Sequence, residues 1–409
     1  MKIVHVTSKT KGGAGVAALR LFKALQNFSD VQVAFVSIDK TINYNGDIIN
    51  DAFFSYLKPT LFKRANLKLA NIFFPTRAFL YRKKLNKFKG QLNCEIASLP
   101  FSHFKLHNHP LVQEADVIHL HWVGDFIDYK SFFSSVNKKL IWTFHDMNPF
   151  QGIFHYENDH FENYDLIRKL DHEIINYKKL QLKKSTLSCL IFPSNWILNK
   201  AKEKTNLIDI KLANVPYTID FNFFKILDKQ KLRKNFNIDS SSPVLLFVAD
   251  RIDVHRKGVD LLFDALKLMD TQVTIITVGS GNVPNFVNHK VVNFGRIEDQ
   301  NTMAEVFNLA DAFVMPSRED NLPNVMLESL ACGVPVISFL NSGAKDFVID
   351  DKTGVLIHEI SAIALKDGIE MFIKNSNGYD PRYIFEFAKK HFNPELVVNK
   401  HINIYRTVL

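Results

Sequence analysis

Short apolar runs that stop abruptly at polar residues recur along this chain, and helical patterns separate them. The first run, KIVHVTS at 2–8, is followed by a glycine-rich turn at 9–15 and by the helical pattern VAALRLFKALQNF at 16–28. Further runs of this kind lie at 31–38, 115–122, 139–146 and 187–194. Runs that are apolar throughout indicate strands buried on both faces, as in a parallel sheet covered by helices. The first half of the chain therefore predicts a doubly wound α/β domain.

A second series of the same kind begins after IDSSSP at 238–243. Apolar runs lie at 244–250, 272–281, 290–295, 312–317 and 335–339, with helical patterns at 257–269 and 302–310. The simplest architecture is α/β, with two Rossmann-like doubly wound domains facing a central cleft that collects the carboxyl ends of both sets of strands. We place the N-terminal domain at 1–214 and the C-terminal domain at 215–390. The last segment, 391–409, predicts a helix whose docking the sequence leaves open.

Composition limits the class of protein. With 46% hydrophobic and 23% charged residues in 409, the chain is typical of globular proteins and long enough for two cores. Its three cysteines show no metal-ligand or redox spacing, which fits a reducing compartment. The N-terminus lacks a signal-peptide pattern, and no apolar run approaches 18 residues. We expect a cytoplasmic protein that does not cross the membrane.

Positive charge is concentrated in one window of the N-terminal half. The net charge is +9, yet the window from Ala52 to Cys94 holds ten lysines and arginines and no acidic residue. Nine phenylalanines and tyrosines are interleaved with them. This pattern suits the interface of an anionic membrane, and nucleic acid is the rival partner. A solvated basic face over ordinary core aromatics explains the window equally well.

The stretch SREDNLPNVMLESLACGVPV, 317–336, carries two carboxylates around a predicted helix. Pro323 suits a first helical turn, and a glycine and a proline end the pattern, so the helix should run from about Pro323 to Cys332. Asp320 and Asn321 then lie before the helix N-terminus, and Glu328 lies on the helix. A carboxylate can hold the two hydroxyls of a ribose. The plainer interpretation is that Asp320 or Asn321 caps the helix and Glu328 is a surface residue.

The stretch ADRIDVHRKG, 249–258, weakens that plainer interpretation. It follows a predicted strand and presents Arg251, Arg256 and Lys257 where a helix begins at Gly258. Cations beside a helix N-terminus suit a diphosphate and would stabilise the charge on a departing nucleoside diphosphate. An ordinary basic loop is the alternative.

The first domain offers a glycine-rich turn and a group of histidines. Gly12 and Gly13 lie between the first strand and its helix and permit close backbone approach to a ligand, although the match to the dinucleotide motif is weak. His145 closes a predicted strand and should face the cleft. A metal site is conceivable there, but no pair has the helical spacing of a zinc protease, so we rank it below hydrogen bonding to substrate. His119 and His121 alternate on one strand and are equally well explained as core residues.

These residues resemble the retaining GT-B glycosyltransferases of family 4 over nearly the whole chain. The segments that carry the resemblance are TKGGAGVAALRLFKAL, DVIHLHW, TFHDMNPFQGIFHY, FPSNW, NVPYTIDFNFF, RKGVDLLFDAL, VGSG and DNLPNVMLESLACGVPVIS. The HLHW and TFHDMNPFQG forms are similar to the branch that builds bacterial exopolysaccharide and O-antigen, including colanic acid glycosyltransferases.

The resemblance implies donor-binding roles for the second-domain residues. Glu328 would hold the ribose hydroxyls, and Asp320 with the backbone of Asn321 and Leu322 would contact the transferred sugar or its phosphates. The first acid of this signature is usually glutamate, so the shorter Asp320 bears on the choice of donor.

The cations and the first domain receive roles from the same resemblance. Lys257 matches the lysine that contacts the diphosphate, and Arg251 matches its arginine partner, for which Arg256 could substitute. His145 matches the histidine that contacts the donor sugar, and the loop of Gly12 and Gly13 matches one that lies against the phosphates or the acceptor.

The resemblance implies a metal-independent hexosyltransferase that uses a UDP- or GDP-linked sugar as a substrate and needs no cofactor. The acceptor would be a lipid-linked saccharide for a bacterial O-antigen, lipopolysaccharide, capsule or exopolysaccharide, met at the inner face of the plasma membrane through the basic window. Two alternatives stay open. The same fold could serve a nucleotide-sugar epimerase or a sugar phosphorylase, or a non-catalytic protein that binds membrane or nucleic acid.

Overall fold

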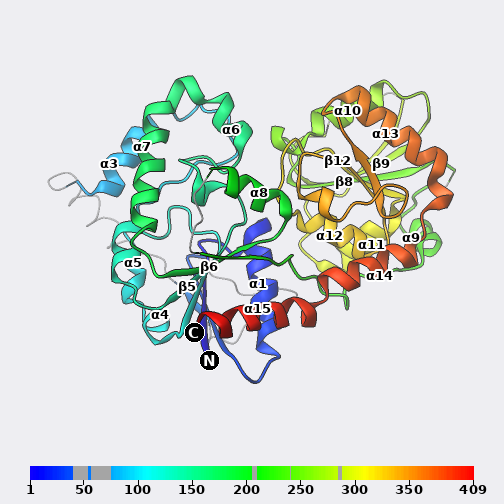
Figure 1. Cartoon of the computed structure of the whole chain (residues 1–409). Coiled ribbons are helices and arrows are strands. Elements are labelled where there is room, and N and C mark those ends of the chain that lie inside the picture. The colour runs from blue at the N-terminus through cyan, green and yellow to red at the C-terminus, as the bar shows by residue number, and fades with distance from the viewer. Residues whose placement is uncertain (40–53, 57–74, 205–209, 240, 284–287) are drawn as a thin grey trace. The chain divides into compact units, whose positions relative to one another are not determined.

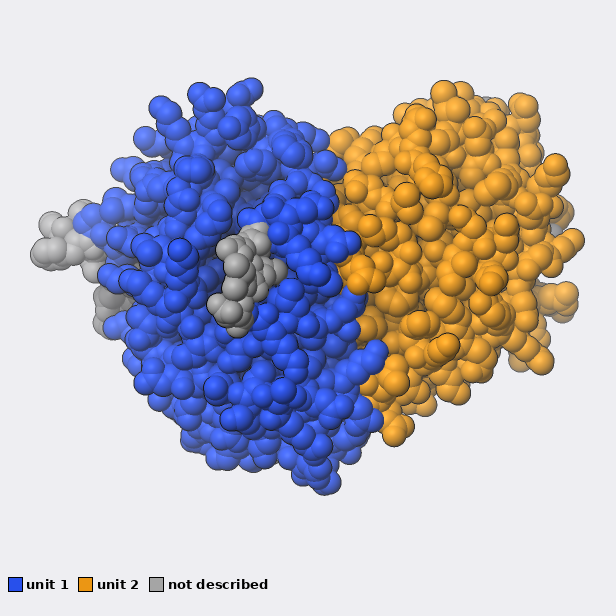
Figure 2. Space-filling view, in the orientation of Figure 1, with its two compact units in different colours: residues 1–193, 197–215, 398–409 blue, residues 194–196, 216–397 orange. Residues whose placement is uncertain are grey.

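A computed structural model describes residues 1–39, 54–56, 75–204, 210–239, 241–283 and 288–409 of the chain (Figure 1). The chain forms two compact units, which Figure 2 shows in different colours. Unit 1 comprises Met1–Pro193, Ile197–Val215 and Val398–Leu409, and unit 2 comprises Ser194–Trp196 and Pro216–Val397. The chain thus passes from unit 1 to unit 2 between Val215 and Pro216, beside the predicted boundary at 214/215. It also assigns most of the last helix to unit 1.

Unit 1 is built on a seven-stranded parallel sheet in the order β3-β2-β1-β4-β5-β6-β7. The strands are β1 (Lys2–Val6), β2 (Gln32–Ser37), β3 (Phe54–Tyr56), β4 (Val117–Leu120), β5 (Lys139–Thr143), β6 (Leu187–Phe192) and β7 (Lys211–Asn214). Residues 3–6 of β1 and all of β4 are buried, which is why these strands are apolar apart from Lys2 and the buried histidines His5 and His119. The order along the sheet reverses between β1 and β4, where His5 pairs in register with His119.

The helices of unit 1 follow its strands, as the alternating pattern predicts. They are α1 (Gly13–Gln26), α3 (Arg77–Asn86), α4 (Pro110–Glu114), α5 (Tyr129–Ser135), α6 (Glu157–Glu162), α7 (Tyr164–Leu182), α8 (Asn195–Lys204) and α15 (Pro394–Val408). Helix α1 begins at Gly13, earlier than the apolar pattern indicated, so the glycine-rich turn ends at Gly12. From Val398 onward α15 belongs to unit 1, where the Tyr405 hydroxyl lies 2.8 Å from Nδ1 of His119.

Unit 2 repeats the plan with a six-stranded parallel sheet in the order β10-β9-β8-β11-β12-β13. The strands are β8 (Val244–Arg251), β9 (Thr274–Ser280), β10 (Lys290–Asn293), β11 (Ala312–Met315), β12 (Val336–Phe339) and β13 (Gly354–Ile357). All were predicted except β13, whose four residues were too short a run to recognise. The order reverses between β8 and β11, so both units have the strand order of a doubly wound fold.

Helices cover both faces of the second sheet. They are α9 (Lys229–Asn235), α10 (Val259–Lys267), α11 (Gln300–Leu309), α12 (Asn324–Ala331), α13 (Ala362–Asn375) and α14 (Pro381–Phe392). Helices α10 and α13 lie on one side of the strands and α11 and α12 on the other (Figure 1). Apolar residues of α10 and α13 share one buried cluster with strand residues such as Leu245, Val314 and Ile337. Burial of this kind is the main stabilising contribution to such a domain.

Gly258 lies where the loops that follow the two central strands of unit 2 approach each other closely. It precedes α10 with φ at +70°, and a Cβ at this position would lie 1.8 Å from the carbonyl oxygen of Pro316, just beyond β11. Both the backbone conformation and the space therefore require glycine. This close approach is what allows the segment after β8 to lie against the segment after β11.

We expect Gly258→Ala to destabilise unit 2 by about 2 kcal/mol or more, because the substitution adds a left-handed strain to a clash with backbone. The corresponding fall in melting temperature is on the order of 4–8 °C for a domain of this size and can be measured by calorimetry. Gly378→Ala is the matched control, since a Cβ there meets no atom within 4 Å. Equal melting temperatures for the two variants would contradict the explanation.

Candidate active site

The switch point of unit 2 brings together the two loops that the sequence analysis singled out. The loop after β8 contains a short 3-10 helix, His255–Lys257, and the loop after β11 contains Glu319 and Asp320. Several hydrogen bonds join them: for example, the Arg318 N–H donates to the carbonyl of Arg256 at 2.8 Å, and the Arg256 guanidinium donates to the carbonyl of Glu319 at 2.9 Å. The loops lie side by side because β8 and β11 are adjacent parallel strands.

Asp320 is the centre of a buried ionic group. One of its carboxylate oxygens, Oδ2, lies 2.6 Å from Nζ of Lys257 and 3.1 Å from Nη1 of Arg256. Burial alone would raise the pKa of Asp320, but Lys257 and then Arg256 lower it below its usual value. The other oxygen accepts a hydrogen bond from the Asn321 N–H at 3.0 Å. The carboxylate is therefore ionised, and it is held by two cations from the neighbouring loop.

The structure separates the two arginines that could accompany Lys257. Arg256 is buried beside Lys257, whereas the Arg251 side chain is 62% exposed and pairs with Asp253 at 2.8 Å. In this structure Arg256 is thus the arginine that shares a carboxylate with Lys257. The functional roles of both arginines stay predictions.

Helix α12 follows the ionic group directly, within one residue of its predicted limits at each end. Pro323 is the N-cap residue, and its side chain makes no capping hydrogen bond. Glu328 is buried on the helix, with 7% of its surface exposed. The interpretation of Glu328 as a surface residue is therefore wrong, and neither Asp320 nor Asn321 is the N-cap residue itself.

The residues next to Asp320 are also buried. Leu322 is 3% exposed, and Oδ1 of Asn321 accepts a hydrogen bond from the Ser194 hydroxyl at 2.7 Å. The Gly343 N–H, in the loop after β12, donates to the Asp320 carbonyl at 3.1 Å. This segment is thus held through the Asn321 side chain and through the Asp320 backbone.

The switch point of unit 1 carries the glycine turn. Gly12 has φ at +80° and ψ at 168°, a conformation that essentially only glycine adopts, and Gly13 is the first residue of α1. The chain after β1 is held to the end of β4 because the Ser8 N–H donates to the carbonyl of Trp122 at 2.7 Å. A Cβ on Gly12 would meet no atom within 4 Å, so the backbone conformation, and not crowding, requires glycine here.

His145 ends a line of three buried imidazoles. Its Nε2 lies 3.0 Å from Nδ1 of His121, and Nε2 of His121 lies 2.9 Å from Nδ1 of His5. Burial lowers the pKa of His145 to about 4, although Asp146 partly opposes the shift. Burial also lowers the pKa of His5 to about 3 and that of His121 well below its ordinary value. All three rings are neutral at pH 7.

A fourth ring, His119, stacks on His121. Its two nitrogens lie 2.8 Å from the Tyr405 hydroxyl and 2.7 Å from the Thr143 hydroxyl. One ring nitrogen from each of His5, His119 and His121 lies within 4.8 Å of the others, so this group could hold a metal ion. A metal site ranked second among the predictions for these histidines, and this set was not predicted because His5 lies more than a hundred residues from the other two.

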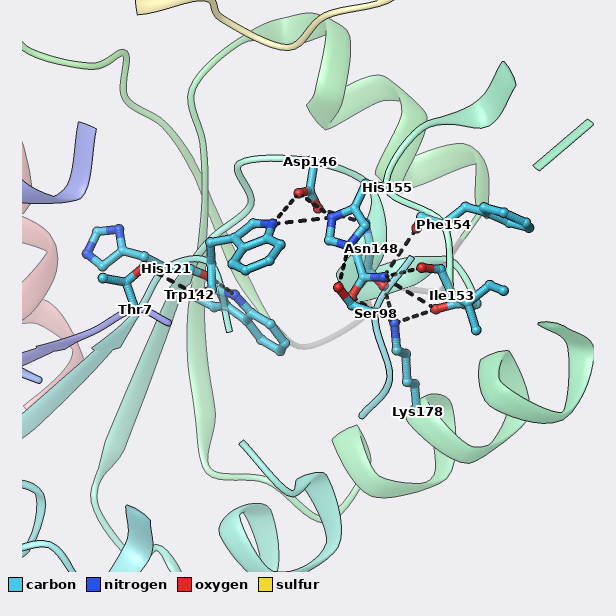
Figure 3. Close-up of polar contacts among 12 residues, drawn as sticks. Thr7, Ser98, His121, Trp142, Asp146, Asn148, Ile153, Phe154, His155 and Lys178 are labelled. Atoms are coloured by element: carbon cyan, nitrogen blue, oxygen red, sulfur yellow. Dashed lines mark hydrogen bonds and ion pairs between the residues drawn. The ribbon is translucent and has the colours of Figure 1, made fainter. Parts of the chain in front are cut away.

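Asp146 and His155 form a second buried polar group (Figure 3). Oδ2 of Asp146 lies 2.6 Å from Nδ1 of His155, whose Nε2 lies 2.8 Å from the Ser98 hydroxyl. Trp122 Nε1 donates to the same carboxylate oxygen at 2.8 Å. The order serine, histidine, aspartate matches that of a nucleophilic triad, but Ser98 and His155 are at most 1% exposed. The group therefore fixes the chain around His145 and is closed to a substrate.

Lys178 of α7 holds the loop that follows His145 (Figure 3). Its ammonium donates to the carbonyls of Asn148 and Gly152, each at 2.6 Å, and to the side-chain oxygen of Asn148 at 3.0 Å. Burial lowers the pKa of Lys178 to about 7. Neither Ser98 nor Lys178 was predicted, since a lone serine and one lysine in a charged helix carry no sequence signal.

The side chains around His145 leave little free space. His121, Trp122, His145, Asp146 and His155 are among the residues that line a cavity of about 10 Å³, roughly the room that one water molecule requires. In this structure the cavity is therefore too small for a sugar.

Comparison with known proteins finds a family match in the second half of the chain. Residues 242–375 match the family described as glycosyl transferases group 1. The group 1 domain thus contains Lys257, Arg256, Asp320 and Glu328 together with the whole sheet of unit 2.

Two relatives extend the similarity beyond the group 1 domain. An uncharacterized glycosyltransferase of Methanocaldococcus jannaschii is 22% identical over 52% of this chain and 56% of its own length. An uncharacterized 41.2 kDa protein in the cps region of Klebsiella pneumoniae is 23% identical over 71% of this chain and 79% of its own length. The chain thus spans little more than half the length of the archaeal relative.

Solved structures establish the fold. Sucrose-phosphate synthase of Thermosynechococcus elongatus has a TM-score of 0.71 at 18% identity, covering 100% of this chain and 99% of its own. Anabaena Alr3699/HepE, solved in complex with UDP-glucose, has a TM-score of 0.66 at 16% identity and covers 100% of both chains. Together with the two doubly wound sheets, these similarities show that the chain has the GT-B fold.

We expect the free energy of unfolding of unit 1 to fall as the pH is lowered from about 6.5 to about 4. In this window the unfolded chain binds protons that the buried imidazoles of the folded chain do not. Each such histidine contributes about 1.4 kcal/mol per pH unit, so His5→Gln should make the dependence shallower by about that amount. Urea unfolding followed by tryptophan fluorescence measures it, since Trp122 and Trp142 lie in unit 1.

The matched control is His358→Gln, which removes an exposed imidazole of unit 2. A pH dependence that is the same in His5→Gln as in the unaltered chain would show that His5 does not contribute to acid sensitivity.

Proposed function

We propose that the protein is a retaining glycosyltransferase that moves a hexose-type sugar from a UDP- or GDP-linked donor to a lipid-linked saccharide in bacterial surface polysaccharide synthesis. The observation that carries the proposal is the group of Lys257, Arg256 and Asp320 at the switch point of a group 1 domain. Ligands of doubly wound sheets bind at such points.

The second unit supplies what a nucleotide-sugar donor requires. Lys257 and Arg256 are cations fixed beside the start of α10, where they would contact the diphosphate and stabilise the charge that develops as it departs. Glu328 is a buried carboxylate on α12 that would accept hydrogen bonds from the ribose hydroxyls. Asp320, Asn321 and Leu322 would lie against the transferred sugar or its phosphates, and Arg251 stays a further candidate contact.

The transfer itself needs no carboxylate nucleophile on the protein. The bond between the anomeric carbon and the phosphate oxygen breaks, and the acceptor hydroxyl forms its new bond on the same face, so that the configuration is retained. The proton of that hydroxyl passes to the leaving phosphate. Fixed cations can stabilise the departing diphosphate without a metal ion.

The first unit would supply the remaining contacts. His145 lies at the end of β5 and is neutral at pH 7, so it can hydrogen-bond a sugar hydroxyl without competing for the diphosphate. The turn at Gly12 and Gly13 offers backbone N–H groups at the start of α1. The donor is a substrate, and no cofactor enters the scheme.

Two relatives support the donor and the pathway. The Anabaena protein was solved with UDP-glucose, and the Klebsiella protein is encoded in a cps region. An epimerase or a phosphorylase on the same fold would act without a saccharide acceptor or with inorganic phosphate instead. Release of nucleoside diphosphate that depends on an acceptor glycan distinguishes transfer from both.

We expect Lys257→Ala to weaken binding of UDP-glucose or GDP-mannose, whichever the protein binds, by on the order of 10- to 100-fold, because a charge-assisted hydrogen bond is lost. Glu328→Gln should weaken binding of the same donor while leaving binding of inorganic diphosphate unchanged, since it alters only the ribose contact. Isothermal titration calorimetry measures both.

Lys374→Ala and Glu359→Gln are the matched controls, because both residues are exposed and lie outside the site. Donor affinity that is the same in all four variants would remove the site assignment.

We also propose that the protein meets an anionic membrane through the basic window at 52–94, at the inner face of the plasma membrane. Only 54–56 and 75–94 of this window are among the described residues. In that part, Phe79 and Leu80 of α3 are exposed beside the exposed lysines Lys83 and Lys87. Exposed apolar and basic side chains on a short helix and at its C-cap, Lys87, suit a charged bilayer surface. None of the described helices is both long enough and apolar enough to span a bilayer.

Some basic residues of the window pair with acidic residues of unit 1 and are therefore unsuitable for charge reversal. Arg82 pairs with Asp125, and Lys84 with Glu173 at 3.3 Å, so reversing either charge would also break a contact within unit 1. The triple variant Lys83→Glu, Lys87→Glu and Lys89→Glu alters exposed residues of the window instead.

We expect this triple variant to bind anionic phospholipid vesicles more weakly, with each lysine near the surface contributing about 1 kcal/mol. Sedimentation with anionic and neutral vesicles measures the effect. The matched control reverses Lys352, Lys374 and Lys390, which are exposed in unit 2. Equal binding by the two triple variants would favour a solvated basic face.

A further inference from the structure

The line of imidazoles behind His145 is a continuous hydrogen-bonded chain. It runs from His5 on β1 through His121, just past the end of β4, to His145, past the end of β5. These strands are neighbours in the sheet, and all three rings are at most 8% exposed. The chain thus begins in the core and ends at the residue proposed to contact the donor sugar.

A neutral imidazole has one N–H donor and one acceptor nitrogen, so a chain of such rings has two possible senses. In one sense each ring donates from Nδ1, and His145 keeps its proton on Nδ1. In the other sense each ring donates from Nε2, and Nδ1 of His145 is an acceptor and a potential base. The sense therefore decides what His145 can do chemically.

The far end of the chain selects the sense. Nε2 of His5 is buried and has no hydrogen-bond partner among the described residues. In the second sense this atom would carry a proton and be a buried N–H without an acceptor, a rare arrangement in proteins. In the first sense it is an acceptor that is not used. The first sense is therefore the one that leaves no unpartnered N–H at the buried His5 end of the chain.

We propose that His5 and His121 are positioning residues that hold His145 in its Nδ1–H tautomer, so that His145 is a hydrogen-bond donor to substrate and not a general base. Nε2 of His145 accepts from Nδ1 of His121, and the Nδ1–H points away from the chain of imidazoles. The ligand that this N–H meets, a donor-sugar oxygen, rests on the proposed function; the tautomer does not.

The orientation of the neighbouring groups supports this assignment. The Trp142 indole N–H donates to the carbonyl of His121 at 2.8 Å and fixes the backbone at the middle ring (Figure 3). Stacking with His119, at 4.2 Å between ring centroids, fixes its plane. His119 is held in turn by two hydroxyls, so the middle ring of the chain has little freedom to reorient.

The test uses the full chain labelled with ¹⁵N-histidine. In a neutral ring the protonated and unprotonated nitrogens have well separated ¹⁵N shifts, and His145→Gln assigns the signals. We expect His145 to carry its proton on Nδ1 in the unaltered protein. A proton on Nε2 overturns the proposal. The tautomer is read in the unaltered protein, with the variant used only for assignment, and the measurement needs no enzymatic activity.

Variants of His121 test its role. His121→Leu removes the donor to His145, so the tautomers of His145 should become mixed, whereas the side-chain amide of His121→Asn lies where Nδ1 was and should restore the Nδ1–H form. His358→Gln, an exposed histidine of unit 2, is the matched control and should change nothing. An unchanged His145 tautomer in His121→Leu would show that His121 does not set it.

Kinetics tests the consequence for transfer. His121→Leu should lower kcat by on the order of 10- to 100-fold with little change in KM for the donor, and His121→Asn should recover most of the loss. If the protein transfers no sugar at all, the proposed function fails while the NMR result still decides the tautomer. If the protein instead binds a stoichiometric metal ion that is lost in His5→Gln and in His119→Gln, the proposed hydrogen bonds between imidazoles are wrong, because these nitrogens would then be metal ligands.

Discussion

In a sheet whose strands are all parallel, every strand ends at the same edge, and the connections leave that edge in opposite directions at one point only. In unit 2 that point lies between β8 and β11. It places Lys257 beside Asp320, 63 residues further along the chain, and the left-handed Gly258 permits the approach. Unit 1 uses the same constraint to place the glycine turn after β1 beside the end of β4. The positions of the candidate residues in both units are thus set first by the order of the strands, and individual contacts only refine them.

This dependence explains how much of the molecule could be predicted from the sequence. Apolar runs such as 244–250 and 312–317 identified the strands because burial on both faces leaves an unbroken apolar signature. Helix α12 was placed within one residue, since a proline begins the pattern and a glycine ends it. Strand β13 was missed because a run of four residues is too short to show a strand or a helix pattern of apolar residues. The positions of Lys257, Asp320 and Glu328 followed from the elements that carry them.

The polar interior of unit 1 could not be predicted in this way. Ser98, His155 and Asp146 are brought together by loops, and Lys178 contacts the loop after β5 from near the C-terminal end of a helix whose pattern is otherwise amphipathic. The line of His5, His121 and His145 requires the register of three neighbouring strands. Periodicity reports which face of an element is buried, but it does not report which polar atoms meet inside. Such groups need tertiary coordinates because their hydrogen bonds join segments that are distant in sequence.

The ion pair between Lys257 and Asp320 has a consequence for selectivity. An anion that approaches Lys257 meets an ammonium group that already has a carboxylate partner at 2.6 Å, within a site that is largely closed to water. A monovalent anion offers little more than the partner it would displace, whereas a diphosphate offers two charged groups to Lys257 and Arg256 at once. If the site binds a diphosphate as proposed, the carboxylate of Asp320 would disfavour small monovalent anions and would be displaced only by a ligand that engages both cations.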